Sequence, residues 1–124
     1  MGATLDLSVL ENLRAYQREG QPDIVTRLID LFLGQAPNHV EAVQTALTSG
    51  DADSLARAAH ALKGASANLG ATKLTSLASE IEVKGRSGDI TSAGDSVAAL
   101  LAEYALVETD LAAQRTPLPN QTGA

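Results

Sequence analysis

The chain has 124 residues, enough for one domain with a modest core, and its Ala- and Leu-rich composition predicts an all-helical fold. A formal net charge of −6, with only one Phe, two Tyr and no Trp, argues against nucleic-acid binding, which relies on basic surfaces and base stacking. The absence of cysteine excludes disulfides and thiolate metal sites and favours a reducing compartment, and no apolar run approaches the roughly 20 residues that span a bilayer.

Two helices are predicted in the first 50 residues. Asp6 can N-cap a short helix that ends at Gly20 and carries the apolar residues Leu7, Val9, Leu10, Leu13 and Tyr16. A longer helix over Pro22–Ser49 begins with an apolar stripe at helical spacing, formed by Ile24, Val25, Leu28, Leu31 and Phe32. Because Gly34 and Pro37 interrupt this stripe, we expect one kinked helix or two stacked ones.

Three further helices complete the predicted fold. One opens at Asp51 or Asp53 and runs to about Leu69, and the next has Thr72 as cap and its end marked by Gly85 and Gly88. The last starts at Asp89, and its inward residues are Ile90, Ala93, Val97, Leu100, Leu101, Tyr104 and Leu111. Short connections make neighbouring helices antiparallel, so the last four helices predict an antiparallel four-helix bundle with the first helix as a lid. The domain is expected over residues 5–115, followed by a disordered tail over residues 116–124.

His60 lies in the third predicted helix, on the side opposite the predicted core. At 100° per residue, Leu62 and Leu69 fall about 180° from His60, whereas Lys63 and Gly64 fall within about 60° of it. A lone histidine in such a pattern is a buried core residue, an inert surface residue or an exposed reactive group. The periodicity disfavours the first of these and leaves the other two open.

Three observations favour a reactive group. Gly64 stands in mid-helix, where glycine costs about 1 kcal/mol relative to alanine unless something must approach the backbone closely. The residues beside the imidazole are small, namely Ala56, Ala61, Gly64 and Ala67. Residues 54–79 contain no Asp or Glu, although the chain has 15 acids, and they include the bases Arg57, Lys63 and Lys73. These features predict a surface that tolerates an anion.

Phosphoryl transfer suits this environment better than metal binding or hydrolysis. His39, the only other histidine, has no metal-ligand spacing to His60. No Ser or Cys nucleophile stands in a recognisable turn, and no carboxylate lies one helical turn from His60 to orient it. An exposed neutral imidazole can attack phosphorus in line, while the nearby Lys63 ammonium offsets the phosphoryl charge.

The segment His60-Ala-Leu-Lys-Gly-Ala-Ser-Ala-Asn-Leu-Gly70-Ala closely resembles the signature of histidine-containing phosphotransfer (HPt) domains of multistep two-component phosphorelays. The resemblance covers roughly residues 5–115. It includes Phe32 followed by Ala36-Pro37 in the preceding helix, and the Gly50-Asp51 start of the third helix.

The resemblance implies a role for each matched residue. His60 would accept a phosphoryl group from a receiver-domain aspartate of a hybrid histidine kinase and pass it to the receiver domain of a response regulator. Lys63 would sit by the phosphoryl oxygens and Gly64 would let the receiver approach, whereas Ser66 and Gly70 would be structural. The receiver would supply Mg²⁺, so this chain would need no cofactor or metal of its own and would be a carrier rather than an enzyme.

Residues around His60 also predict a docking patch for the receiver domain. Its proposed members are Val9, Leu10, Ile29, Leu33, Arg57 and Ala67. The alternative is that the apolar members simply pack the lid onto the bundle.

Two rival functions remain open at this stage: the phosphoacceptor domain of a chemotaxis-type histidine kinase, and a non-catalytic helical adaptor. We expect a cytoplasmic monomer, or the cytoplasmic end of a membrane sensor kinase. Nucleic acid and direct membrane contact are not expected.

Overall fold

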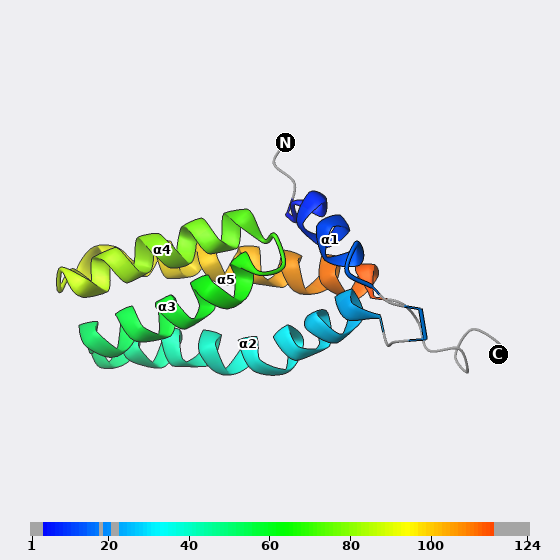
Figure 1. Cartoon of the computed structure of the whole chain (residues 1–124). Coiled ribbons are helices and arrows are strands. Elements are labelled where there is room, and N and C mark those ends of the chain that lie inside the picture. The colour runs from blue at the N-terminus through cyan, green and yellow to red at the C-terminus, as the bar shows by residue number, and fades with distance from the viewer. Residues whose placement is uncertain (1–3, 18, 21–22, 116–124) are drawn as a thin grey trace.

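The computed structural model describes residues 4–17, 19–20 and 23–115, which form helices and their connections (Figure 1). The helices are α1 (Leu7–Arg14), α2 (Ile24–Ser49), α3 (Ala52–Ala67), α4 (Thr72–Arg86) and α5 (Ile90–Gln114). The predicted all-α fold is confirmed: α2 to α5 form the bundle, and α1 lies at the end where α3 connects to α4 (Figure 1). Pro22 and the tail over residues 116–124 lie outside the described residues.

The bundle places α3 and α5 at opposite corners. α3 packs against α4 and α2, and α5 packs against the same two helices. The core between them is almost entirely aliphatic, with large, fully buried side chains such as Ile29, Leu55, Leu62, Leu74, Ile81 and Leu100. One side of α3 therefore points into the core while its other side faces solvent.

Aspartates begin four of the helices, because a carboxylate can accept from the free N–H groups of a first turn. Asp6 accepts from the Ser8 N–H at 3.1 Å, as predicted for the lid helix. Asp23, Asp51 and Asp89 cap α2, α3 and α5 in the same manner. The helix α4 differs from the prediction, since its N-cap is Ala71, which offers no side-chain hydrogen bond, and Thr72 is already helical.

The helix α2 is continuous through Pro37, which settles the choice between one helix and two. Its inner face differs from the predicted stripe: Ile29 is fully buried, whereas Leu31 is 55% exposed. The buried residues recur every three or four positions, as Val25, Ile29, Phe32, Ala36, Val40 and Val43. Apolar residues cover two adjacent sides of α2, and only one side faces the core. The sequence pattern placed Leu31 on the core-facing side, but it lies on the other. The lid α1 is also shorter than predicted, ending at Arg14 rather than Gly20.

Gly85 is buried in the last turn of α4, which ends at Arg86, so the helix ends between Gly85 and Gly88 as predicted. A Cβ atom at this position would lie 2.8 Å from the Ala56 nitrogen and 2.9 Å from the Ala52 oxygen. Glycine thus lets the backbones of α3 and α4 approach closely. Ala56, expected beside the exposed imidazole, is instead buried under this contact.

Gly70 lies in the connection between α3 and α4 and contacts the N-terminal end of the lid helix α1. Its φ of +74° is in the left-handed region, and its carbonyl accepts from the Asp6 N–H at 2.6 Å. A Cβ there would lie 2.6 Å from the Asp6 oxygen. Glycine is required here by both conformation and space.

The helix α5 is long and apolar enough to cross a membrane by length and composition alone, although acids such as Asp95 and Glu103 interrupt its apolar residues. A core helix of a bundle can pass the same test. Here the stripe of Val97, Leu100, Val107 and Leu111 is buried in the core.

Candidate functional site

His60 is presented to solvent on α3, as the helical periodicity predicted, with 62% of its side chain exposed. Its Nδ1 atom lies 2.9 Å from Oε2 of Glu82 on α4. The close contact of Gly85 with Ala56 explains this pairing. His60 is four residues after Ala56, Glu82 is three residues before Gly85, and the two helices run antiparallel.

Glu82 is a buried carboxylate surrounded by donors. Only 7% of its side chain is exposed, and Oε1 accepts from Lys63 Nζ at 2.6 Å. Oε2 accepts from Arg86 Nη2 at 2.7 Å and Nε at 3.1 Å, in addition to His60. The hydrogen bonds from Lys63 and then Arg86 lower the pKa of Glu82 from 4.5 to about 2. Glu82 is therefore ionised at neutral pH.

The carboxylate determines which imidazole nitrogen is reactive. An ionised carboxylate can only accept hydrogen bonds, so the atom facing it, Nδ1 of His60, carries the hydrogen. In the neutral ring, Nε2 then holds the lone pair. An exposed imidazole with Nε2 free is a nucleophile that an electrophilic phosphorus can reach.

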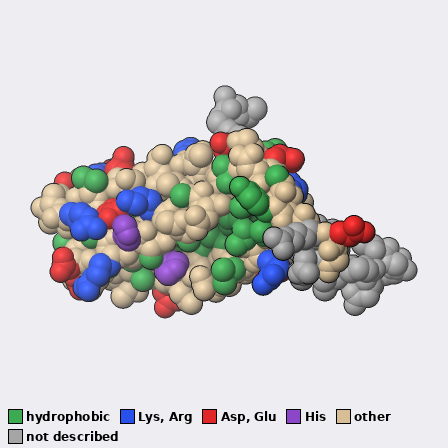
Figure 2. Space-filling model, viewed as in Figure 1, with side chains coloured by type: hydrophobic (Ala, Val, Ile, Leu, Met, Phe, Trp, Pro, Cys, Tyr) green, Lys and Arg blue, Asp and Glu red, His purple; other side chains and the backbone are tan. Residues whose placement is uncertain are grey.

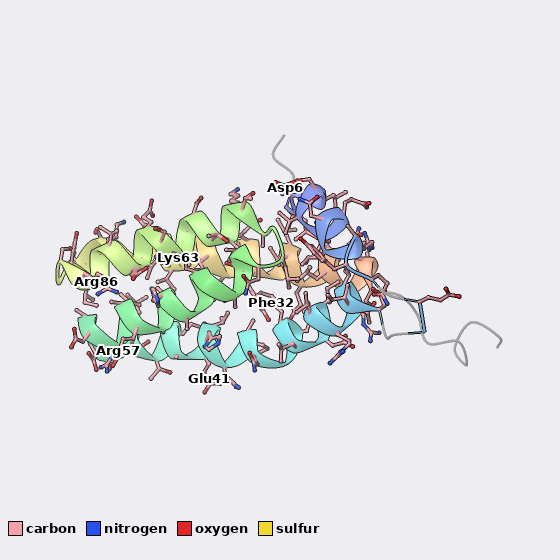
Figure 3. The ribbon with its side chains drawn as sticks, viewed as in Figure 1. Asp6, Phe32, Glu41, Arg57, Lys63 and Arg86 are labelled. Atoms are coloured by element: carbon pink, nitrogen blue, oxygen red, sulfur yellow. The ribbon has the colours of Figure 1, made fainter. Side chains whose placement is uncertain are left out.

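The sequence did not indicate the carboxylate beside His60. Glu82 reaches the ring from α4, outside the acid-free stretch over residues 54–79 and not from one turn along α3. The region still carries positive charge: Lys63 and Arg86 project from neighbouring helices on one face (Figures 2 and 3).

Sequence reasoning missed Glu82 and Arg86, although a signal was present. Leu74, Ala78, Glu82 and Gly85 recur on one face of α4, and the other three are buried core or contact residues. A charged side chain at an inward position of a helix requires a partner. That requirement singles out Glu82 but does not say which helix supplies the partners.

Gly64 is exposed, and an added Cβ would meet nothing within 4 Å. Packing within the described residues does not require a glycine at this position. Ser66, by contrast, is fully buried and its hydroxyl lies 2.8 Å from that of Thr75. The structural role implied for Ser66 thus matches a hydrogen bond across the α3–α4 interface.

The predicted docking residues divide into two groups. Leu10 and Ile29 are fully buried, so the prediction that they face a partner is wrong. Both lie on the inner faces of their helices, in the core. The others are at least partly accessible: Val9 and Leu33 are half-buried, and Arg57 and Ala67 are exposed.

A shallow apolar groove of about 100 Å³ lies between α2 and α3 on the side of α3 toward the lid. It is lined by Leu28, Leu31, Phe32, Gln35, Ala65, Asn68 and Leu69. Asn68 is eight residues after His60, which corresponds to about 12 Å along a helix. Figure 2 shows hydrophobic side chains gathered on this face toward α1, with Lys and Arg side chains gathered toward the other end. Leu31, which the pattern had assigned to the core, is the most exposed apolar residue of this groove.

His39 lies in α2 and is half-buried. Across the described residues, no group of three or more His, Cys, Asp or Glu side chains is arranged to hold a metal ion.

A helical bundle that presents one oriented imidazole beside two cations has the groups that a carrier of phosphoryl groups on histidine requires. The comparisons with known proteins agree. The family model for the Hpt domain matches residues 27–110, and this chain belongs to that family.

A similar solved structure is the crystal structure of histidine-containing phosphotransfer protein B (HptB) from Pseudomonas aeruginosa PAO1, with 28% sequence identity and a TM-score of 0.83. The match covers 93% of this chain and 96% of that one. No curated protein matches the chain. The resemblance drawn from the sequence is confirmed, and the chain is assigned to histidine phosphotransfer in phosphorelays, in which Hpt proteins act as phosphoryl carriers and interact with receiver domains.

Proposed function

We propose that His60 is the phosphoacceptor and that it carries a phosphoryl group from the aspartate of one receiver domain to that of another. The observation that carries this proposal is the exposed imidazole whose Nδ1 is bound to Glu82. The Nε2 lone pair forms the N–P bond, the P–O bond to the donor aspartate breaks, and its electron pair stays on the carboxylate oxygen. The second transfer reverses these changes onto a new aspartate.

Lys63 and Arg86 offset the phosphoryl charge. Oε2 of Glu82 accepts hydrogen bonds from three N–H groups, although a carboxylate oxygen has only two lone pairs. Arg86 can therefore turn away while His60 and Lys63 still donate to the carboxylate. Arg86 is 64% exposed and is free to make this movement. Phosphoryl transfer requires positive charge placed beside the developing anion, and Lys63 and Arg86 supply two such charges.

Gly64 gives the receiver domain room beside the imidazole, and the groove between α2 and α3 receives its apolar surface. The docking surface then consists of Leu31 and the groove, together with Val9, Leu33, Arg57 and Ala67. The receiver contributes Mg²⁺, and the carrier is a cytoplasmic monomer that keeps this face free. Leu31→Ala is expected to weaken receiver binding without lowering the melting temperature, because Leu31 is more than half exposed.

The test is transfer from a phosphorylated receiver domain. Wild type is expected to gain phosphate that is labile in acid and stable in base, and His60→Gln to gain none. His39→Gln is the matched control, because it removes the other histidine of the chain and should be phosphorylated normally. Equal labelling of wild type and His60→Gln contradicts the proposal.

A further inference from the structure

We propose that the receiver domain also docks on α4, through the exposed side chain of Val83, so that His60 lies inside the contact area and not at its edge. The inference rests on the proposed function of His60 and treats the groove between α2 and α3 as one part of the docking surface. Its basis is an exposed apolar side chain next to the cations that flank His60.

Val83 is 63% exposed, although valine is among the residues most often found buried. In the described part of the chain, the exposed large hydrophobic side chains are Leu7, Tyr16, Leu31, Val83 and Leu106. Two of these, Leu31 on α2 and Val83 on α4, belong to the two helices that pack against α3. The helix that presents His60 therefore has an exposed apolar side chain on its neighbour to either side.

Arg86 connects Val83 to the surroundings of His60. It follows Glu82 by four residues and Val83 by three, so its side chain lies between theirs on the surface of α4. Arg86 and His60 both bind Oε2 of Glu82. Moving outward from His60, a partner thus meets Arg86 first and Val83 next. Figure 3 shows Arg86 and Lys63 on this face of α3 and α4.

The surface of α3 lets one partner reach both neighbouring helices. Beyond His60, the exposed side of α3 continues with Gly64 and Ala67, so little side-chain volume stands between α2 and α4. Packed helices lie about 8–10 Å apart, axis to axis. A specific interface covers roughly 800 Å² of each partner, which corresponds to a disc of about 16 Å radius. A receiver domain centred on His60 therefore covers parts of α2 and α4 together, and the groove fills only one side of that area.

The position of Val83 also suits the charge of the site. Once an apolar contact at Val83 is covered, it excludes water from the outer side of Arg86. The attraction between a cation and a phosphoryl group is stronger where water is excluded. The partner surface that fits this edge is an apolar side chain flanked by acidic groups, which pair with Lys63 and Arg86.

The simpler alternative is that Val83 is an isolated exposed side chain, as many surface hydrophobic residues are. Leu106 is the matched example, because it is also aliphatic and is 55% exposed. It belongs to α5, at the opposite corner of the bundle from α3. A receiver domain that covers His60 should shield Val83 and leave Leu106 open.

The chain has no cysteine, so single-cysteine variants can map the covered area. The experiment uses Leu31→Cys, Val83→Cys and Leu106→Cys in the full chain, and the probe is a cysteine-free receiver domain that phosphorylates wild type. Alkylation by iodoacetamide is timed with and without the receiver at about ten times its half-saturating concentration. We expect the receiver to slow alkylation about tenfold at positions 31 and 83, since about nine-tenths of the chains are then bound, and to leave position 106 unchanged.

The contribution of Val83 to binding is tested by the rate of phosphorylation over a range of receiver concentrations. Val83→Ala removes two methyl groups and should raise the half-saturating concentration about threefold to tenfold, with an unchanged maximal rate. Val83→Glu should raise it further, because the added carboxylate offsets the charge of Arg86. Leu106→Ala should behave as wild type.

The inference is overturned if the receiver protects Leu31→Cys but not Val83→Cys, or if Leu106→Cys is protected equally. It is also overturned if Val83→Ala keeps the wild-type half-saturating concentration, or if only its maximal rate falls. Wild type that accepts no phosphate contradicts the function of His60 itself, whereas normal transfer with an unprotected Val83→Cys contradicts only docking on α4.

Discussion

Two glutamates are buried in the bundle, and their surroundings are opposite. Glu82, at the α3–α4 interface, accepts hydrogen bonds from His60, Lys63 and Arg86. Glu103 on α5 is 4% exposed, its Oε1 is 3.9 Å from Lys73 Nζ, and its buried Oε2 has no hydrogen-bond partner among the described residues. Both oxygens of the Glu82 carboxylate accept hydrogen bonds, whereas the Glu103 carboxylate has only the Lys73 ammonium nearby.

The difference between Glu82 and Glu103 shows when a buried carboxylate stabilises the fold. A carboxylate removed from water stabilises a fold only when donors replace its hydration, and an unpartnered oxygen costs about 1–3 kcal/mol. Glu82 meets this condition and also reaches a reactive surface group. Glu103 does neither, so the two positions should respond in opposite directions to substitution.

The largest expected effect comes from separating the helices that bring Glu82 to His60. Gly85→Ala places a Cβ within 3 Å of backbone atoms of α3, so α4 must move away, at a cost of about 1–3 kcal/mol in the free energy of unfolding. Urea denaturation followed by circular dichroism measures this loss. Gly94→Ala on α5 is the control, since its Cβ would meet nothing within 4 Å. A Gly85→Ala variant as stable as wild type would show that the close approach of α3 and α4 is unnecessary.

The next effect is a pH dependence at Glu82. Its pKa is lowered to about 2 in the folded chain from 4.5, mainly by the hydrogen bond from Lys63. The ionised form therefore stabilises the fold fully above about pH 5, and this contribution is lost as the pH falls toward 2. At pH 7 we expect Glu82→Gln to be less stable than wild type by about 1–3 kcal/mol. Unfolding free energies measured at several pH values should converge in acid, and a difference that stays constant from pH 7 to pH 3 would contradict this explanation.

Substitution of Glu103 is expected to change the free energy of unfolding in the opposite direction. Glu103→Leu replaces a poorly partnered carboxylate by an apolar side chain and should raise the free energy of unfolding by about 1 kcal/mol. Transfer to His60 should be unchanged, because α5 lies at the opposite corner from α3. A destabilised Glu103→Leu variant would mean that Lys73 serves Glu103 better than a separation of 3.9 Å indicates.

The smallest change in stability is expected at Gly64, where it should be accompanied by lost function. Gly64→Ala meets no atom within 4 Å and improves helix propensity, so it should add up to about 1 kcal/mol of stability. The added methyl group faces the receiver and should slow transfer. Gly94→Ala gives the matched gain in stability on a distant helix and should leave transfer unaffected. If the two variants transfer equally fast, Gly64 does not provide clearance for the partner.

The sequence predicted the parts of the molecule that depend on local pattern. The aspartate caps, the all-helical fold and the outward direction of His60 follow from spacing within one helix. The environment of His60 depends on the register between α3 and α4, which is set by the fit of Gly85 over Ala56. A glycine near the end of a helical pattern indicates a stop as readily as a close contact, so Glu82 was missed.

The same reasoning explains the error in the docking patch. Ile29 and Leu31 belong to two adjacent apolar arcs of α2, and a helical wheel does not show which arc meets the rest of the bundle. Only the position of α3 decides that Ile29 is core and that Leu31 borders an open groove.

The most direct test of the central claim is to find which nitrogen of the chain carries the phosphoryl group. After transfer from a phosphorylated receiver domain to the ¹⁵N-histidine-labelled chain, phosphorus–nitrogen coupling identifies the bonded atom. We predict a single phosphoryl group on Nε2 of His60, because Nδ1 is turned to the buried Glu82 carboxylate. Phosphate on Nδ1 of His60, or on His39, would contradict this explanation of the site.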